Sequence, residues 1–108
     1  MIGTFNVEDG GSGVDVIGRY AYVTDSFGLK IIDISVPSSP VLLGSFNVEG
    51  GGIDVEVNEN YAYITDLNGL NIVDISNKEK PTLMGRVEAY DRSNSVRVRG
   101  IYAFVGTF

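Results

Sequence analysis

Residues 20–35 read YAYVTDSFGLKIIDIS and residues 61–76 read YAYITDLNGLNIVDIS, so the same two segments recur after 41 positions. The similarity extends outward: with this shift and no gaps, residues 3–43 and 44–84 are identical at 22 of 41 positions. YAFVG at 102–106 begins a third copy. A fixed period of about 20–50 residues is typical of repeat proteins, in which one unit cannot bury its apolar face alone. The sequence therefore predicts a stack of copies of one unit.

Each unit contains four short segments with the pattern of β-strands. The first is Val-x-Val, as at 14–16, whose alternation is typical of a strand. The second is Tyr-Ala-Tyr-[Val/Ile]-Thr-Asp, in which aromatic and β-branched residues favour a pleated surface. The third, at 28–35, is apolar on both faces, as expected of a strand buried between two layers. The fourth follows Pro40 or Pro81, and no segment shows helical periodicity, so the chain is predicted to be all-β.

Four antiparallel strands in about 40 residues are the content of one β-propeller blade. The chain is accordingly predicted to form a single repeat domain over 1–108, made of an outer strand at 2–8, a blade at 13–49, a second blade at 53–89 and a partial blade at 95–107. Propellers close with about 4–8 blades. We therefore expect other copies of the chain, or neighbouring blades of a longer chain, to complete the ring.

A resemblance to a known family follows from the third segment. LKIID at 29–33 and LNIVD at 70–74, each followed by Ile-Ser, resemble the LVIVD repeat, and the pattern S-x-P-x-x-P-x-x-L-G at 35–44 fits the same repeat. The resemblance implies β-propeller blades and an extracellular, cell-surface location in bacteria or archaea, and it implies no common catalytic residues. The chain departs from the pattern at Lys78, which stands where the first unit has Pro37.

Several residues recur at equivalent positions in the units, which indicates structural roles. We expect Ile31 and Ile72 to be buried in the third strand of each blade. Asp33 and Asp74 are each expected to accept a structural hydrogen bond, for example from a loop amide. Packing between blades is expected for the recurring aromatic residues Tyr20, Tyr22, Tyr61, Tyr63 and Tyr102.

Composition and charge exclude several classes of function. The net charge of −6 argues against a nucleic-acid partner, because a phosphate-binding surface needs clustered lysine and arginine. The chain has no histidine and no cysteine, which excludes Ser-His and Cys-His catalysis, thiolate metal sites and disulfides. No apolar run approaches the roughly 18 residues that cross a bilayer. The first residues, MIGTFNVEDGG, lack the basic and apolar parts of a signal peptide.

Candidate ligand-binding residues lie in the loops that gather on one face of a propeller. These loops are acidic with apolar tips, a combination that suits a peptide, a glycan or a cation. The candidates are Asp25, Phe27, Asp54, Asp66, Leu67 and Arg92. Asp25 and Asp66 also have the oxygen ligands that calcium prefers, although Asp-x-x-Gly is a common turn. Solvated, turn-forming carboxylates are the alternative interpretation.

The C-terminal part of the chain carries the opposite charge from the rest. Residues 83–108 have a net charge of +2, whereas residues 1–41 have −3 and residues 42–82 have −5. Such asymmetry favours an assembly edge that attracts an acidic edge of a neighbouring chain, and the residues predicted to form it are Arg86, Arg97 and Arg99. Uneven composition without a role is the alternative. Arg97 and Arg99 replace Glu56 and Asn58 of the second unit.

The function predicted from these features is a non-enzymatic binding or scaffolding module that self-assembles from propeller blades. Its expected partners are other copies of the chain and a protein or glycan ligand. One alternative is a propeller-type hydrolase or lyase that uses carboxylates around the central channel. Another is an engineered or fragmentary propeller segment without a ligand.

Overall fold

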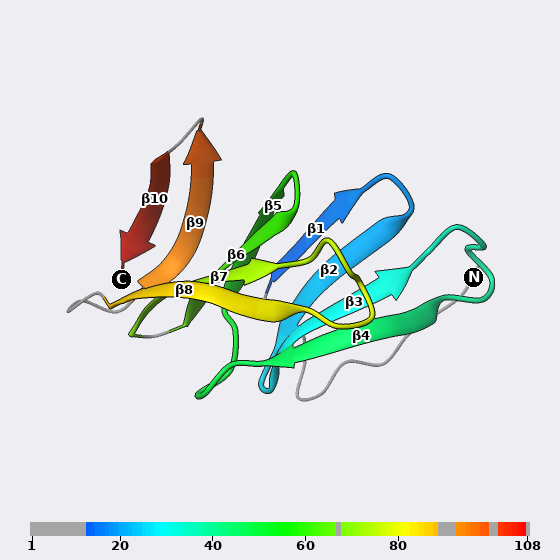
Figure 1. Ribbon diagram of the computed structural model, residues 1–108, viewed down its shortest axis with the longest axis horizontal. Helices are drawn as coiled ribbons and strands as arrows, with labels where there is room; N and C mark the ends of the chain where they lie inside the picture. The colour runs from blue at the N-terminus through cyan, green and yellow to red at the C-terminus, as the bar shows by residue number, and fades with distance from the viewer. Residues whose placement is uncertain (1–12, 67, 89–92, 100–101, 108) are drawn as a thin grey trace.

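The computed structural model describes residues 13–66, 68–88, 93–99 and 102–107, and these residues form ten β-strands (Figure 1). The strands are β1 Gly13–Ile17, β2 Tyr20–Asp25, β3 Gly28–Asp33, β4 Val41–Asn47, β5 Asp54–Asn58, β6 Tyr61–Asp66, β7 Gly69–Asp74, β8 Thr82–Glu88, β9 Ser93–Arg99 and β10 Tyr102–Thr107. The all-β prediction is confirmed. Within the described ranges, no helix is long and apolar enough to cross a membrane.

The strands pair in chain order into three antiparallel sheets. Strands β1–β4 form the first blade, β5–β8 form the second blade, and β9–β10 form a pair that we call the third unit. The repeat is also a repeat of register: Tyr22 pairs with Ile31, and Tyr63 pairs with Ile72. The outer strand predicted at 2–8 lies outside the described residues.

Aspartates order the chain where the third strand of each blade ends. The Ser35 N–H donates to Asp33 Oδ1 at 2.8 Å, and the Ser76 N–H donates to Asp74 Oδ1 at 2.8 Å. These bonds confirm the predicted structural hydrogen bond in each blade. They bend the chain away from the strand, since an aspartate that binds an amide two residues on favours a turn.

The main core lies between the first and second blades. Figure 1 shows the inner strands side by side, with β1 and β9 on either side of β5. Tyr22, Leu29 and Ile31 of the first blade pack in one cluster with residues of the second blade, namely Val55, Val57, Ala62, Ile64, Val73 and Ile75. A second cluster joins Leu70 to Val96 and Val98 of the third unit. Apolar contacts between consecutive blades therefore supply the core.

Tyrosines and third-strand isoleucines differ between the blades. Tyr20 and Tyr63 pack against the clusters as predicted, whereas Tyr61 is exposed. Ile31 is fully buried as predicted, but Ile72 is only half-buried at the edge of the second cluster. The cause of this difference is the neighbour on each face: the first blade packs on a complete second blade, whereas the second blade packs on the two-stranded third unit.

Equivalent residues are buried where a neighbouring blade is present and exposed where none is described. On the inner strands, Val55 and Val57 are 3% and 9% exposed, whereas Val14 and Val16 of β1 are 62% and 53% exposed. On the fourth strands, Leu43 and Phe46 pack against the core between the blades. Their counterparts Met84 and Val87 are 58% and 59% exposed. Both ends of the described stack thus present apolar surface of the kind that is buried inside it.

Candidate functional site

The turn between β2 and β3 is organised by Asp25, one of the predicted ligand-binding residues. Its carboxylate is buried and accepts hydrogen bonds from the N–H groups of Phe27 at 2.9 Å and Gly28 at 3.1 Å. The Lys30 Nζ lies 2.7 Å from Asp25 Oδ2 and 5.7 Å from the centre of the exposed Phe27 ring. Asp25 therefore holds the turn and neutralises a lysine of the same blade.

The equivalent turn of the second blade is organised by Asp66 with a different cation. Asp66 accepts hydrogen bonds from the Asn68 N–H at 2.7 Å, from Asn71 Nδ2 at 3.0 Å and from an Arg86 guanidinium nitrogen at 2.6 Å. Asn71 stands at the repeat position of Lys30, and Arg86 stands at that of Ser45. The positive charge has moved from the third strand to the fourth, so the buried aspartate stays neutralised, as burial of a charge requires.

These contacts bear on the calcium hypothesis. The carboxylates of Asp25 and Asp66 both receive N–H donors and a cationic side chain. In the part of the chain that the structure describes, no group of three or more acidic, histidine or cysteine residues is arranged to hold a metal ion. The structure thus supports the turn interpretation for these two aspartates.

Acid should destabilise the chain through Asp66. Burial alone would raise the pKa of Asp66, but hydrogen bonds from Arg86, Asn71 and the Asn68 N–H outweigh burial and hold that pKa below its ordinary value. An unfolded aspartate titrates near pH 4. The stabilisation is therefore complete above about pH 4 and is lost as the pH falls through the lower pKa of the folded chain.

We expect the free energy of unfolding to fall between pH 5 and pH 2, and we expect D66N to show a smaller fall because its amide does not titrate. Urea unfolding across this range measures both. Asp33 and Asp74 also have lowered pKa values, caused by hydrogen bonds from Ser35 and Ser76, so D66N should keep part of the acid sensitivity. An equal loss in the wild type and D66N would contradict the role of Asp66.

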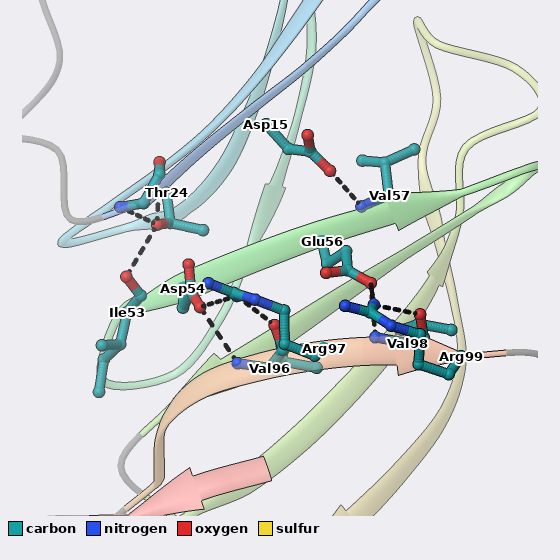
Figure 2. Close-up of polar contacts among 11 residues, drawn as sticks. Asp15, Thr24, Ile53, Asp54, Glu56, Val57, Val96, Arg97, Val98 and Arg99 are labelled. Atoms are coloured by element: carbon teal, nitrogen blue, oxygen red, sulfur yellow. Dashed lines mark hydrogen bonds and ion pairs between the residues drawn. The ribbon is translucent and has the colours of Figure 1, made fainter. Parts of the chain in front are cut away.

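A second set of acidic residues joins the inner strands of consecutive blades. In each case a carboxylate of one blade accepts the backbone N–H of a residue 42 positions later, in the next blade (Figure 2). We call these bonds the inter-blade carboxylate contacts. They run from Val57 N to Asp15 Oδ2 at 2.7 Å, from Val96 N to Asp54 Oδ2 at 3.1 Å, and from Val98 N to Glu56 Oε2.

The arginines predicted to form an assembly edge pair with carboxylates of this chain. Arg86 contacts Asp66, as described above. Arg97 lies 3.5 Å from Asp54 Oδ2, and Arg99 lies 3.8 Å from Glu56 Oε2 (Figure 2). The guanidinium groups of Arg97 and Arg99 are exposed, so each of these two ion pairs contributes at most about 1 kcal/mol. Arg97 and Arg99 thus partly neutralise the carboxylates that join the second blade to the third unit.

The predicted ligand-binding residues that the structure describes therefore lie at two different kinds of position in the fold. Asp25, Phe27 and Asp66 lie at the turns between second and third strands, whereas Asp54 begins β5 and takes part in an inter-blade carboxylate contact. Leu67 and Arg92 lie outside the described residues. Asp15 and Glu56 were missed by the sequence analysis. The available signal was an acidic residue between two valines at the same position of both units.

Two grooves lie between the first and second blades. The first groove has a volume of about 610 Å³. Its charged lining residues are Glu49, Asp66, Arg86 and Glu88. The hydrogen bond to Asp66 raises the pKa of Arg86, and the two glutamates add to this effect, although burial opposes it. The bidentate approach of Arg86 to Asp66 keeps both groups engaged, so this groove does not by itself identify a ligand.

The other groove, of about 550 Å³, contains Lys78, the residue that departs from the repeat pattern. The Lys78 Nζ lies 4.9 Å from the centre of the Tyr20 ring in the first blade, and Arg19 lies 5.3 Å from the same ring. A cation over an aromatic face is worth about 0.5–1 kcal/mol at an exposed site. Lys78 therefore contributes a contact between blades where the first unit has proline.

The sheets, their shared register and the inter-blade carboxylate contacts define a repeat module of propeller-like blades. The model of the LVIVD repeat family matches residues 11–48 and 49–89, and the chain belongs to this family. Each match covers the residues of one four-stranded sheet. A search of curated proteins finds none that matches the chain.

Proposed function

We propose that the chain is a non-enzymatic scaffolding and binding module that works by stacking its blades against the blades of other copies. The observation that carries this proposal is the exposure of Val14 and Val16. Their counterparts Val55 and Val57 are buried by a neighbouring blade, and so are Val96 and Val98. Stacking against a second copy would remove this surface from water through apolar contact of the kind that buries Val55 and Val57 against the first blade.

The free energy expected from burying this apolar surface is large enough to drive association. Full burial of one valine-sized or leucine-sized side chain contributes about 1.5–3 kcal/mol. The exposed surface includes Val14 and Val16 at one end of the described stack and Met84 and Val87 at the other. Contiguous apolar surface that is exposed in this way is typical of an interaction site.

Two observations support a non-enzymatic role. The chain has no histidine and no cysteine, so it lacks the histidine bases and cysteine nucleophiles that many hydrolases use. The inner-strand carboxylates Asp15, Asp54 and Glu56 accept backbone N–H groups of the next blade. Groups held in this way serve as structural acceptors. Binding through the stacked blades is therefore the activity that the chain supports best.

Sedimentation equilibrium over a range of concentrations tests the proposal. The wild type should have a mass above the 11.6 kDa of one chain, and V16K should shift the equilibrium toward the single chain because it places a charge in the contact. V36K is the control, since Val36 is also exposed but lies in the loop between β3 and β4. A folded wild type that remains a single chain at every concentration would overturn the proposal, as would equal effects of V16K and V36K.

A further inference from the structure

The inter-blade carboxylate contacts have a direction. The acceptor always belongs to the earlier blade, and the donor is an edge N–H group on the inner strand of the next blade. Strands β1 and β5 pair with their second strands in the same register, with Val16 opposite Ala21 and Val57 opposite Ala62. The Val16 N–H group therefore lies on the edge of β1 that corresponds to the Val57 N–H group, which binds Asp15.

The residue that would face Val16 in a stack of copies is set by the repeat. Asp15 binds the amide of Val57, and Glu56 binds the amide of Val98. The next residue in this series is Arg97, which occupies the same repeat position in the third unit. A guanidinium group only donates hydrogen bonds, so it cannot accept one from the N–H group of Val16.

We infer that the edge of β1 at Val16 is a docking site for an inner strand that carries aspartate or glutamate where the third unit carries Arg97. The preferred partner is a blade with the sequence Val-[Asp/Glu]-Val in its first strand, as in both blades of this chain. In another copy of the chain, the third unit would face Val16, and it carries Arg97 in place of this acceptor. This inference rests on the proposed stacking between copies.

Replacing the side chain of Arg97 should leave the apolar core intact. This side chain is exposed and reaches from β9 toward Asp54 of β5, and it also donates to the Val96 carbonyl at 2.7 Å (Figure 2). The buried residues of β9 are Val96 and Val98, which alternate with the arginines. A change at Arg97 therefore alters the inter-blade edge and leaves the apolar contact with Leu70 in place.

The test compares R97E with R99E by sedimentation equilibrium. R97E places an acceptor at the position of Asp15 and Glu56, and a hydrogen bond to a charged acceptor should tighten the association of copies about tenfold. R99E makes the same change of charge at the repeat position of Ile17 and Asn58, where no inter-blade carboxylate contact forms, so it should not tighten association. R97D, which carries the side chain of the first blade, serves as a second variant if R97E folds poorly.

The outcomes separate the inference from the proposed function. A wild type and variants that all stay single chains would refute the stacking itself. A wild type that associates, with R97E and R97D no tighter than R99E, would refute docking at Val16 and leave the stacking intact. Equal tightening by R97E and R99E would mean that overall charge, rather than an acceptor opposite Val16, controls the association.

Discussion

Replacing Ile31 by alanine is expected to lower the free energy of unfolding by about 2–5 kcal/mol. Ile31 is fully buried in β3 and packs in the cluster that joins the first and second blades. Its removal leaves a cavity between two sheets that cannot move together without breaking their other contacts. Urea unfolding monitored by circular dichroism measures the loss.

The repeat supplies a matched control at Ile72. The same substitution, I72A, should cost less, because Ile72 is half-buried beside the third unit. The sequence predicts equal burial of the two isoleucines, so the difference between I31A and I72A reports the packing of blade on blade. Equal losses, or a loss below about 1 kcal/mol for I31A, would contradict the assignment of the core to the contact between the blades.

Replacing Gly44 by alanine is expected to cost about 1–3 kcal/mol. A Cβ atom at Gly44 would overlap the backbone carbonyl oxygen of Lys78 and crowd Glu79, which belong to the second blade. Backbone atoms cannot rotate away as a flexible side chain can, so the two blades would have to separate locally. Thermal or urea unfolding of G44A measures the cost.

Gly85 is the matched position in the second blade. A Cβ atom there would meet nothing within 4 Å, so G85A should change the stability of the single chain little. If other copies stack on this side, G85A should instead weaken their association. A similar destabilisation of the single chain by G44A and G85A would show that the close approach of the blades at Gly44 is not what constrains the glycine.

The strands and turns could be predicted because their signals are local. Asp33 and Asp74 bind amides only two residues away, and the strand patterns depend on alternation within a few residues. The repetition of the unit also predicts the order of the sheets, since consecutive units form neighbouring blades. These parts of the fold follow from short stretches of sequence.

The inter-blade carboxylate contacts could not be predicted in the same way. Asp15 and Glu56 alternate with valines, and alternation alone indicates only a side chain that points away from the apolar face. Their partners are amides 42 residues later, and the match depends on how one sheet sits against the next. The pairing of Asp66 with Arg86 is similar, because it requires β8 to pass beside the turn between β6 and β7. Non-local geometry decides these contacts.

Amide hydrogen exchange tests the central claim, that each inner strand docks on the preceding inner strand through its own edge N–H groups. At low concentration the amides of Val57 and Val98, which bind Asp15 and Glu56, should exchange slowly, and the amide of Val16 should exchange fast. Raising the concentration should slow exchange at Val16 as copies stack. Fast exchange at Val57 and Val98, or protection of Val16 equal to theirs in the single chain, would contradict the account.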